Sequence, residues 1–340
     1  MRRRDFLTGA AAFAFDPQKM SEAVKLVRNA TASHYLTAAA FEVGRDGTVE
    51  ADLNGTGVFL LASISKPMTA TGVMILVDRG QLSLSDPVRK FIPEFHGGDR
   101  DLVSVRHLLT HSSGLPDMLP ENTELRRRHA PLKDFVAATC KTPLLFKPGS
   151  EVRYQSMGIL LAAEIAERVT RRPFRDFLAD EVFRPLGMRQ TSLGLGGRRI
   201  ADTEQCQVSG DEDWSWNSPY WRNLGAPWGG VHSTGRDVTT FLKAFLDPDG
   251  RVLKRETMAA MTTNQTAGLN KPWGLGWSVE AGTFGKACSA RTFGHAGSTG
   301  TLAWCDPAKR TTFVLLTTRP LAESESKLIR PVSDLVSEAA

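Results

Sequence analysis

The sequence lacks the patterns that mark several large classes of protein. Its four cysteines, Cys140, Cys206, Cys288 and Cys305, lie far apart and form no Cys-x-x-Cys pair, which disfavours a structural zinc site. No apolar run approaches the roughly 20 residues that a membrane-spanning helix needs. There is no Gly-x-Ser-x-Gly elbow, no phosphate-binding loop and no dinucleotide fingerprint. These absences disfavour an α/β-hydrolase and a nucleotide-dependent enzyme. Cys288 and Cys305 flank a predicted hairpin, and the sequence leaves open whether they are bonded.

Charge of one sign is not in large excess either. The chain of 340 residues has 42 basic and 37 acidic side chains, a formal net charge of +5. The basic residues cluster only briefly, at Arg2–Arg4, Arg126–Arg128, Arg171–Arg172 and Arg198–Arg199, without interleaved aromatic residues. We therefore expect no nucleic-acid partner. A hydrophobic content of 41% is ordinary for a globular chain of one large domain or two interlocked ones, and the oligomeric state stays open.

The N-terminus has the features of an export signal. Arginines at 2–4 precede an apolar run that contains Ala12-Phe13-Ala14, and Arg3-Arg4-Asp5-Phe6-Leu7 is similar to the twin-arginine type. Asp16-Pro17 predicts a helix cap with proline in the first turn, so the folded chain should begin there. We interpret residues 1–15 as a leader, short for its kind. Export to the periplasm is the first expectation and a cytoplasmic location the second.

Strand-like runs lie near both ends of the chain, and helix-like runs lie between them. The pattern predicts strands at 36–43, 48–53, 275–279, 292–295, 300–305 and 311–317, and helices at 17–31, 158–169 and 321–338. The expected fold class is α/β (α+β), with an antiparallel sheet built from both termini, flanking helices and an inserted, mostly helical region. Residues 16–66 and 225–340 form the predicted sheet-containing region, and residues 67–224 form the helical one. Residues 213–228, with four tryptophans, predict a long surface loop near a pocket.

Ser63 and Lys66 are the first candidates for chemistry. They stand three residues apart before the helix-like run 69–77, so they would share one helix face. A serine hydroxyl needs a neighbouring base to become a nucleophile, and a buried lysine can serve because burial lowers its pKa. The same spacing recurs at Ser324 and Lys327 among charged residues, which we interpret as a solvated helix face. The motif therefore needs support from elsewhere in the chain.

Two distant segments can supply that support. Tyr154 precedes an apolar helix, and a phenol beside a lysine ammonium loses its proton more readily and can act as a base. Ser156, two residues on, could hydrogen-bond the lysine or the substrate. Near the other end, His295 and Gly297 lie on a predicted strand that ends at Ser298. The Ser298 N–H, paired with that of Ser63, would form an oxyanion hole.

Metal binding is not expected. His107 and His111 are four residues apart, as in metal-binding helices, but Leu108 stands where a zinc peptidase needs glutamate. No third ligand is evident, so we interpret His111 as a hydrogen-bonding residue of a loop. We expect neither a metal nor an organic cofactor.

These segments together resemble the penicillin-recognising serine hydrolases, which include class C β-lactamases, D-alanyl-D-alanine carboxypeptidases and β-lactamase-like carboxylesterases. The likeness runs from about residue 17 to 335 and includes 108–115, 183–188, 229–234 and 274–277. It implies a β-lactamase/transpeptidase-like fold. It also implies roles for the motif residues: Ser63 as acyl-accepting nucleophile, Lys66 and Tyr154 as the base pair, and the Ser63 and Ser298 amides as the oxyanion hole.

Two departures from the family pattern bear on the substrate. Ser156 stands where the family usually has asparagine, which offers an amide to an acylamido side chain. His295 stands where β-lactamases carry the lysine that holds the substrate carboxylate, and a histidine is mostly neutral near pH 7. We therefore expect a carboxylesterase that acts on small esters. The alternatives are a D-amino-acid peptidase or carboxypeptidase, a weak β-lactamase, or a catalytically silent binder of peptides or cell-wall fragments.

Overall fold

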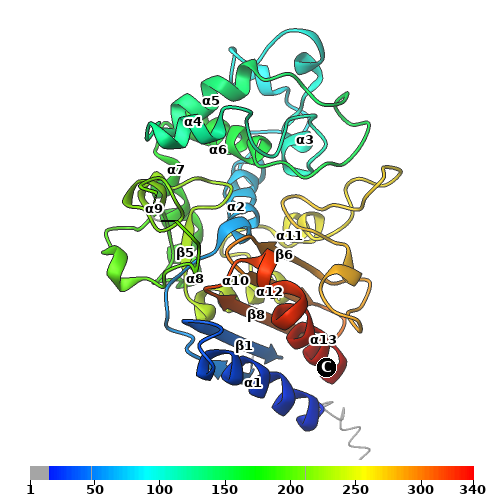
Figure 1. The fold of residues 1–340 in the computed structure, drawn as a ribbon. Helices are drawn as coiled ribbons and strands as arrows, with labels where there is room; N and C mark the ends of the chain where they lie inside the picture. The colour runs from blue at the N-terminus through cyan, green and yellow to red at the C-terminus, as the bar shows by residue number, and fades with distance from the viewer. Residues whose placement is uncertain (1–14, 47, 211) are drawn as a thin grey trace, which may run out of the picture.

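One five-stranded sheet joins the two ends of the chain (Figure 1). The computed structural model describes residues 15–46, 48–210 and 212–340, so the predicted leader lies outside the described residues except for Phe15. The sheet has the order β2-β1-β8-β7-β6, and every neighbouring pair is antiparallel. Its strands are β1 (Ala39–Arg45), β2 (Thr48–Leu53), β6 (Phe293–Gly297), β7 (Thr301–Asp306) and β8 (Thr311–Thr317). The predicted antiparallel sheet from both termini is confirmed.

Both faces of this sheet are buried. Alternate residues of a strand point to opposite faces, and β8 accordingly places Phe313 and Leu315 in one hydrophobic cluster and Val314 and Leu316 in another. The first cluster is closed by α1 and α13, which lie together on one side of the sheet (Figure 1). The second continues through α10 into the helical region. The sheet is thus an internal layer.

The helices correspond to the predicted mostly helical insertion and its flanks. Asp16 caps α1 by accepting from the N–H of Gln18, as the Asp16-Pro17 pair predicted. The predicted closing helix is divided, because a π-helical turn at Glu325–Ile329 separates its two α-helical parts. The helices are α1 (Pro17–Ala32), α2 (Ser65–Asp78), α3 (Val105–Leu109), α4 (Asn122–Arg127), α5 (Leu132–Lys141), α6 (Met157–Thr170), α7 (Phe174–Leu178), α8 (Arg184–Leu186), α9 (Pro219–Leu224), α10 (Gly235–Leu246), α11 (Arg255–Met261), α12 (Leu321–Ser324) and α13 (Arg330–Ala339).

Helix α2 lies at the centre of the molecule, between the sheet and the helices α3 to α6 (Figure 1). All residues from Ser65 to Leu76 are buried, including one charged side chain, Lys66. A helix that is apolar on every side is stable only inside a core, which explains why this one is enclosed. It therefore holds its first turn rigidly where the sheet and the helical region meet.

The local structure departs from the sequence pattern in three places. The run 275–279 makes only isolated bridges, because Gly276 at φ +82° interrupts the extended backbone. A second sheet, β3 (Phe59–Leu60), β5 (Val231–Ser233) and β4 (Ser192–Leu193), was not expected, and its strands are too short to show periodicity. The segment 213–228 is not simply a surface loop, because it contains α9, which Ser218 caps, and buries Trp221 and Trp228. Its predicted place near a pocket is confirmed, since both of these tryptophans line a cavity.

Among the residues described, no helix combines the length and apolar character needed to cross a membrane. Cys288 and Cys305 are both free thiols, as are Cys140 and Cys206.

Candidate active site

Ser63 and Lys66 are in contact at the start of α2. The Lys66 Nζ lies 2.9 Å from the Ser63 Oγ and donates to the Trp228 carbonyl, also at 2.9 Å. Ser63 belongs to a 3₁₀ turn, Ala62–Ile64, that leads into the helix, and Ala62 holds a left-handed φ of +48°. Such a conformation is uncommon for a residue with a side chain, and strain of this kind concentrates at functional sites.

The environment of Lys66 favours its neutral form. The side chain is completely buried, and this burial lowers its pKa to about 7, while the charge of Asp117 opposes the shift. A neutral amine has a lone pair that can accept the proton of the neighbouring hydroxyl. The burial that such a lysine needs is therefore present. The second Ser-x-x-Lys copy differs, because Lys327 is exposed while Ser324 is buried and bonded to backbone carbonyls.

Tyr154 reaches the same hydroxyl. Its phenol hydrogen-bonds Ser63, and the Lys66 Nζ lies 4.7 Å from the centre of its ring. Burial raises the pKa of Tyr154, and this effect exceeds the opposing one of the hydrogen bond to Ser63. The expectation that the phenol loses its proton readily is therefore not met, because the ring is enclosed rather than solvated. Burial thus favours the neutral form of both side chains, the amine of Lys66 and the phenol of Tyr154.

The loop after α3 holds Tyr154 in place. His111, at φ +58°, packs its ring 4.7 Å from that of Tyr154, accepts from the Gln155 N–H at its Nδ1 and accepts from the Arg153 N–H at its carbonyl. The interpretation of His111 as a loop hydrogen-bonding residue is confirmed. His107 instead accepts from the Ser104 N–H and caps α3, so the two histidines have separate structural tasks. Among the described residues, no group of three or more potential metal ligands occurs.

Strand β6 passes close to Ser63 because of Gly297. A Cβ atom there would overlap the Leu61 carbonyl and the Thr301 hydroxyl, so only glycine allows this approach. The hydroxyl of Thr301 donates to the Leu61 carbonyl at 2.9 Å, and that of Thr299 donates to the Leu60 carbonyl at 2.7 Å. These bonds fix the end of β6, with Ser298, beside the turn that carries Ser63. Both residues line the same cavities.

His295 lies on β6 beside Tyr154. Its ring centre is 5.9 Å from that of Tyr154, and its Nδ1 contacts the Ala296 carbonyl at 2.7 Å. Burial and the nearby Lys66 lower the pKa of His295 to about 3, so the ring is neutral at pH 7. Because the Nδ1 then carries the proton, the Nε2 is an acceptor, and it has no partner among the described residues. His295 thus offers a lone pair and no positive charge.

Two cavities meet at Ser63 and Tyr154. The first, about 310 Å³, is lined by Asp117, Ser156 and Trp216, and also by Trp221 and Trp228; we call it the tryptophan cavity. The second, about 440 Å³, is lined by His295, Lys271 and Trp273, among others; we call it the histidine cavity. A substrate carbonyl at Ser63 therefore has room for one group on each side, which suits an acyl part and a leaving group.

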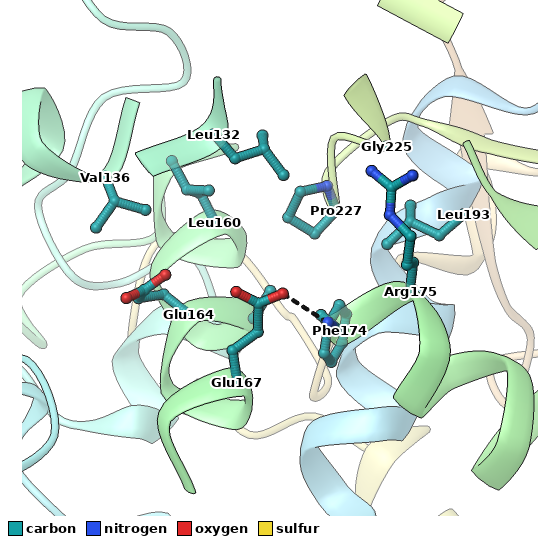
Figure 2. Close-up of a pocket in the computed structure, with 11 residues that line it drawn as sticks. Leu132, Val136, Leu160, Glu164, Glu167, Phe174, Arg175, Leu193, Gly225 and Pro227 are labelled. Atoms are coloured by element: carbon teal, nitrogen blue, oxygen red, sulfur yellow. Dashed lines mark hydrogen bonds between the residues drawn. The ribbon is translucent and has the colours of Figure 1, made fainter. Parts of the chain in front are cut away.

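A smaller cavity of about 70 Å³ lies beside the segment that contains Pro227 and Trp228 (Figure 2). Pro227 lines it, while its neighbour Trp228 lines the tryptophan cavity. Figure 2 shows Glu167 beside it, accepting the Phe174 N–H at 2.5 Å. None of the predicted site residues lines this cavity.

The structure thus brings together every predicted site residue: Ser63, Lys66, Tyr154, Ser156, His295, Gly297 and Ser298. The hydroxyl of Ser156 does not hydrogen-bond Lys66; it donates to the Asp117 Oδ1 at 2.6 Å. Sequence reasoning missed Asp117, Trp273 and the Trp228 carbonyl. A signal existed for two of them, because Asp117 follows the breaker-rich loop 110–116 and Trp273 directly precedes the 274–277 segment.

Comparison with known protein families assigns the chain to one of them. The sequence model of the Beta-lactamase family matches residues 23–336, and the chain belongs to this family. It is 28% identical over 304 residues to an Escherichia coli (strain K12) protein named "Putative D-alanyl-D-alanine carboxypeptidase", covering 76% of this chain and 68% of that protein. It is 30% identical over 279 residues to "Penicillin-binding protein 4" of Amycolatopsis lactamdurans, covering 72% of each.

Solved structures have the same fold. The structure described as "EstCE1, a hydrolase with promiscuous acyltransferase activity" superposes with a TM-score of 0.78 at 20% identity, covering 94% of this chain and 99% of that one. The predicted β-lactamase-like fold is confirmed.

Proposed function

We propose that this chain is a serine hydrolase that works through an acyl-enzyme on Ser63 and prefers small esters. The observation that carries the proposal is the contact of one hydroxyl with the buried amine of Lys66 and the phenol of Tyr154. Lys66 lies 2.9 Å from the Ser63 Oγ, and the Tyr154 phenol hydrogen-bonds the same atom. This is the arrangement that an activated serine nucleophile needs.

The proposed reaction has two halves. In the first, the Ser63 Oγ bonds to the substrate carbonyl carbon while its proton passes to the Lys66 Nζ. The amide N–H groups of Ser63 and Ser298 hold the oxygen anion of the tetrahedral intermediate. The ester C–O bond then breaks, and the departing alkoxide takes a proton from the phenol of Tyr154, which Lys66 replenishes. In the second half, water attacks the acyl group by the same route, and Ser63 regains its proton.

The preference for esters follows from the two substrate-side residues. A neutral His295 offers an acceptor where a β-lactamase would offer a cation, so a substrate carboxylate gains no ion pair there. Ser156 already donates to Asp117, which leaves no amide to bind an acylamido group. An alkoxide is also a better leaving group than an amine, so an ester places a smaller demand on the site.

The experiment is hydrolysis of p-nitrophenyl acetate and butyrate by wild type and Ser63→Ala, with intact-mass detection of a fluorophosphonate adduct. We expect turnover and one adduct in wild type and neither in the variant. Ser112→Ala is the matched control, because Ser112 is buried and bonded to Thr110 but does not line either cavity. Equal rates for wild type and Ser63→Ala would exclude the mechanism.

A second candidate is a peptidase that acts on D-alanyl peptides. Two observations favour it: the names of the relatives given above, and Lys271 in the lining of the histidine cavity. Lys271 forms an ion pair with Glu280 at 3.0 Å. A higher kcat/KM on D-alanyl-D-alanine peptides than on p-nitrophenyl esters would favour this candidate over the first.

A further inference from the structure

The tryptophan cavity contains one carboxylate. Asp117 is the only acidic residue among the described residues that line it, and the only basic one is Arg126. The rest of the lining is aromatic, apolar or neutral, and it includes Ser63 and Tyr154. A single negative charge in such a place favours a cation on the bound substrate.

Asp117 is not neutralised by the protein. Its Oδ1 accepts the Ser156 hydroxyl at 2.6 Å, and its carbonyl accepts the Ser156 N–H at 3.3 Å. Among the residues that the structure describes, no lysine, arginine or histidine forms an ion pair with it. Its side chain is on the exposed wall of the cavity. One carboxylate oxygen is therefore oriented by Ser156, and the other can accept from a ligand.

The guanidinium of Arg126, the other charged residue of this cavity, contacts tryptophans of the aromatic wall. The guanidinium carbon lies 4.0 Å from the centre of the Trp221 ring, and the Nη2 donates to the Trp214 carbonyl at 2.8 Å. These contacts hold the guanidinium against the aromatic wall, while its Nε has no hydrogen-bond partner among the described residues. Arg126 thus contacts the aromatic wall, and in the part of the chain that the structure describes it forms no ion pair with Asp117.

The carboxylate is close to the reacting groups. Its charge acts on both Lys66 and Tyr154, and Ser156 connects it to the segment that carries Tyr154. In an α-amino acyl group the nitrogen is two bonds from the carbonyl carbon that Ser63 would attack. An ammonium at that position would lie on the Asp117 side, and the side chain of the same residue would face the tryptophans.

We propose that the tryptophan cavity selects α-amino acyl substrates, binding their free ammonium group at Asp117 and their apolar side chain against Trp216, Trp221 and Trp228. This inference rests on the proposed function, since it assumes acylation of Ser63. It narrows the substrate class from small esters to esters of α-amino acids with an unblocked amino group. A charge-assisted hydrogen bond of this type is expected to change kcat/KM by about ten- to a hundredfold.

The test compares phenylalanine methyl ester, as D and L forms, with methyl 3-phenylpropanoate, which lacks only the amino group. Proton release in a pH-stat gives kcat/KM for each. The measured quantity is the ratio of amino ester to deamino ester in wild type and in Asp117→Asn, because intrinsic differences in ester reactivity cancel between the two enzymes. We expect the ratio to fall at least tenfold in the variant. Glu124→Gln, an exposed acid on the neighbouring helix paired with Arg127, should keep the wild-type ratio.

A second measurement uses pH. In wild type the same ratio should decrease more steeply than in Asp117→Asn as the pH rises through the pKa of the substrate amine, because the effect of that proton on ester reactivity is common to both enzymes. The titration of Lys66 cancels because both esters use it. A ratio that is the same in wild type and Asp117→Asn at every pH would overturn this inference while leaving the serine hydrolase intact. Failure of Ser63→Ala to abolish hydrolysis of either ester would instead overturn the proposed function.

Discussion

The Lys66 side-chain nitrogen and the Trp228 carbonyl oxygen are 2.9 Å apart, in a position with no access to solvent. The segment before β5 therefore holds the amine, and the hydroxyl of Thr69 fixes that segment by donating to the Pro227 carbonyl at 2.6 Å. A neutral amine that donates one N–H to a carbonyl presents its lone pair in a limited direction. Here that direction includes the Ser63 Oγ, also at 2.9 Å.

The pH dependence of kcat/KM follows from this arrangement. Lys66 must be neutral to accept the proton, and its pKa is lowered to about 7, so activity should rise with pH along a one-proton limb centred near pH 7. The charge of Asp117 raises the pKa of Lys66, so Asp117→Asn should move this limb to lower pH. Initial rates on p-nitrophenyl butyrate across pH 5–9, corrected for spontaneous hydrolysis, give the position of this limb in wild type and in Asp117→Asn. A limb at the same pH in the variant would contradict the coupling.

Burial of Lys66 also predicts a dependence of stability on pH. Unfolded lysine binds a proton below its ordinary pKa of 10.5, whereas the folded one does so only below about 7. Between these values the unfolded state binds more protons, so the contribution of Lys66 to the free energy of unfolding becomes less favourable as the pH falls, and levels off below 7. The free energy of unfolding of Lys66→Met, relative to that of wild type, should therefore increase by on the order of a few kcal/mol as the pH falls from 10 to 7.

Urea unfolding of both proteins at several pH values measures this difference. Lys327→Met is the control, because Lys327 is exposed on the second Ser-x-x-Lys copy. The difference in the free energy of unfolding between Lys327→Met and wild type should stay constant with pH. A constant difference for Lys66→Met as well would mean that the buried amine keeps its proton in the folded state.

Much of the fold and of the site was predictable from the sequence, because both depend on patterns that are local. Residues 311–317 alternate between two buried faces and were predicted as a strand with the observed bounds. Ser63 and Lys66 were paired by helix geometry alone. By contrast, Asp117 is an exposed acid in a loop, and the lysine acceptor is the backbone carbonyl of Trp228, which no side-chain pattern reports. The protonation of Tyr154 depends on enclosure by His111 and Trp273, which is a property of the tertiary structure.

Tyr154→Phe separates the roles of the phenol and the amine. The change removes the hydroxyl that contacts Ser63 and keeps the ring against His111, so the fold should be retained. Loss of a proton-transfer partner should lower kcat by about 10²- to 10⁴-fold. Because Lys66 is the titrating base, the acid limb near pH 7 should remain in the residual activity. Disappearance of that limb would assign it to the phenol rather than to Lys66.

The substitution Gly297→Ala tests whether the position of β6 affects kcat. A Cβ at this residue would overlap the Leu61 carbonyl, so Gly297→Ala should push the end of β6, with Ser298, away from Ser63. Loss of one oxyanion donor lowers kcat by about 10²- to 10³-fold, and overpacking costs about 1–3 kcal/mol of stability. The matched control is Gly282→Ala, since a Cβ there meets no atom within 4 Å.

Steady-state kinetics and thermal unfolding of the two glycine variants separate these effects. Gly297→Ala should lose kcat much more than it changes KM, because the oxyanion forms only after the substrate has bound. Thermal unfolding gives the transition temperature of each protein, and kinetic assays below that temperature ensure that the assayed variant is folded. Full kcat in a folded Gly297→Ala protein would mean that the Ser298 amide does not hold the developing charge, and the oxyanion hole would then need a donor other than β6.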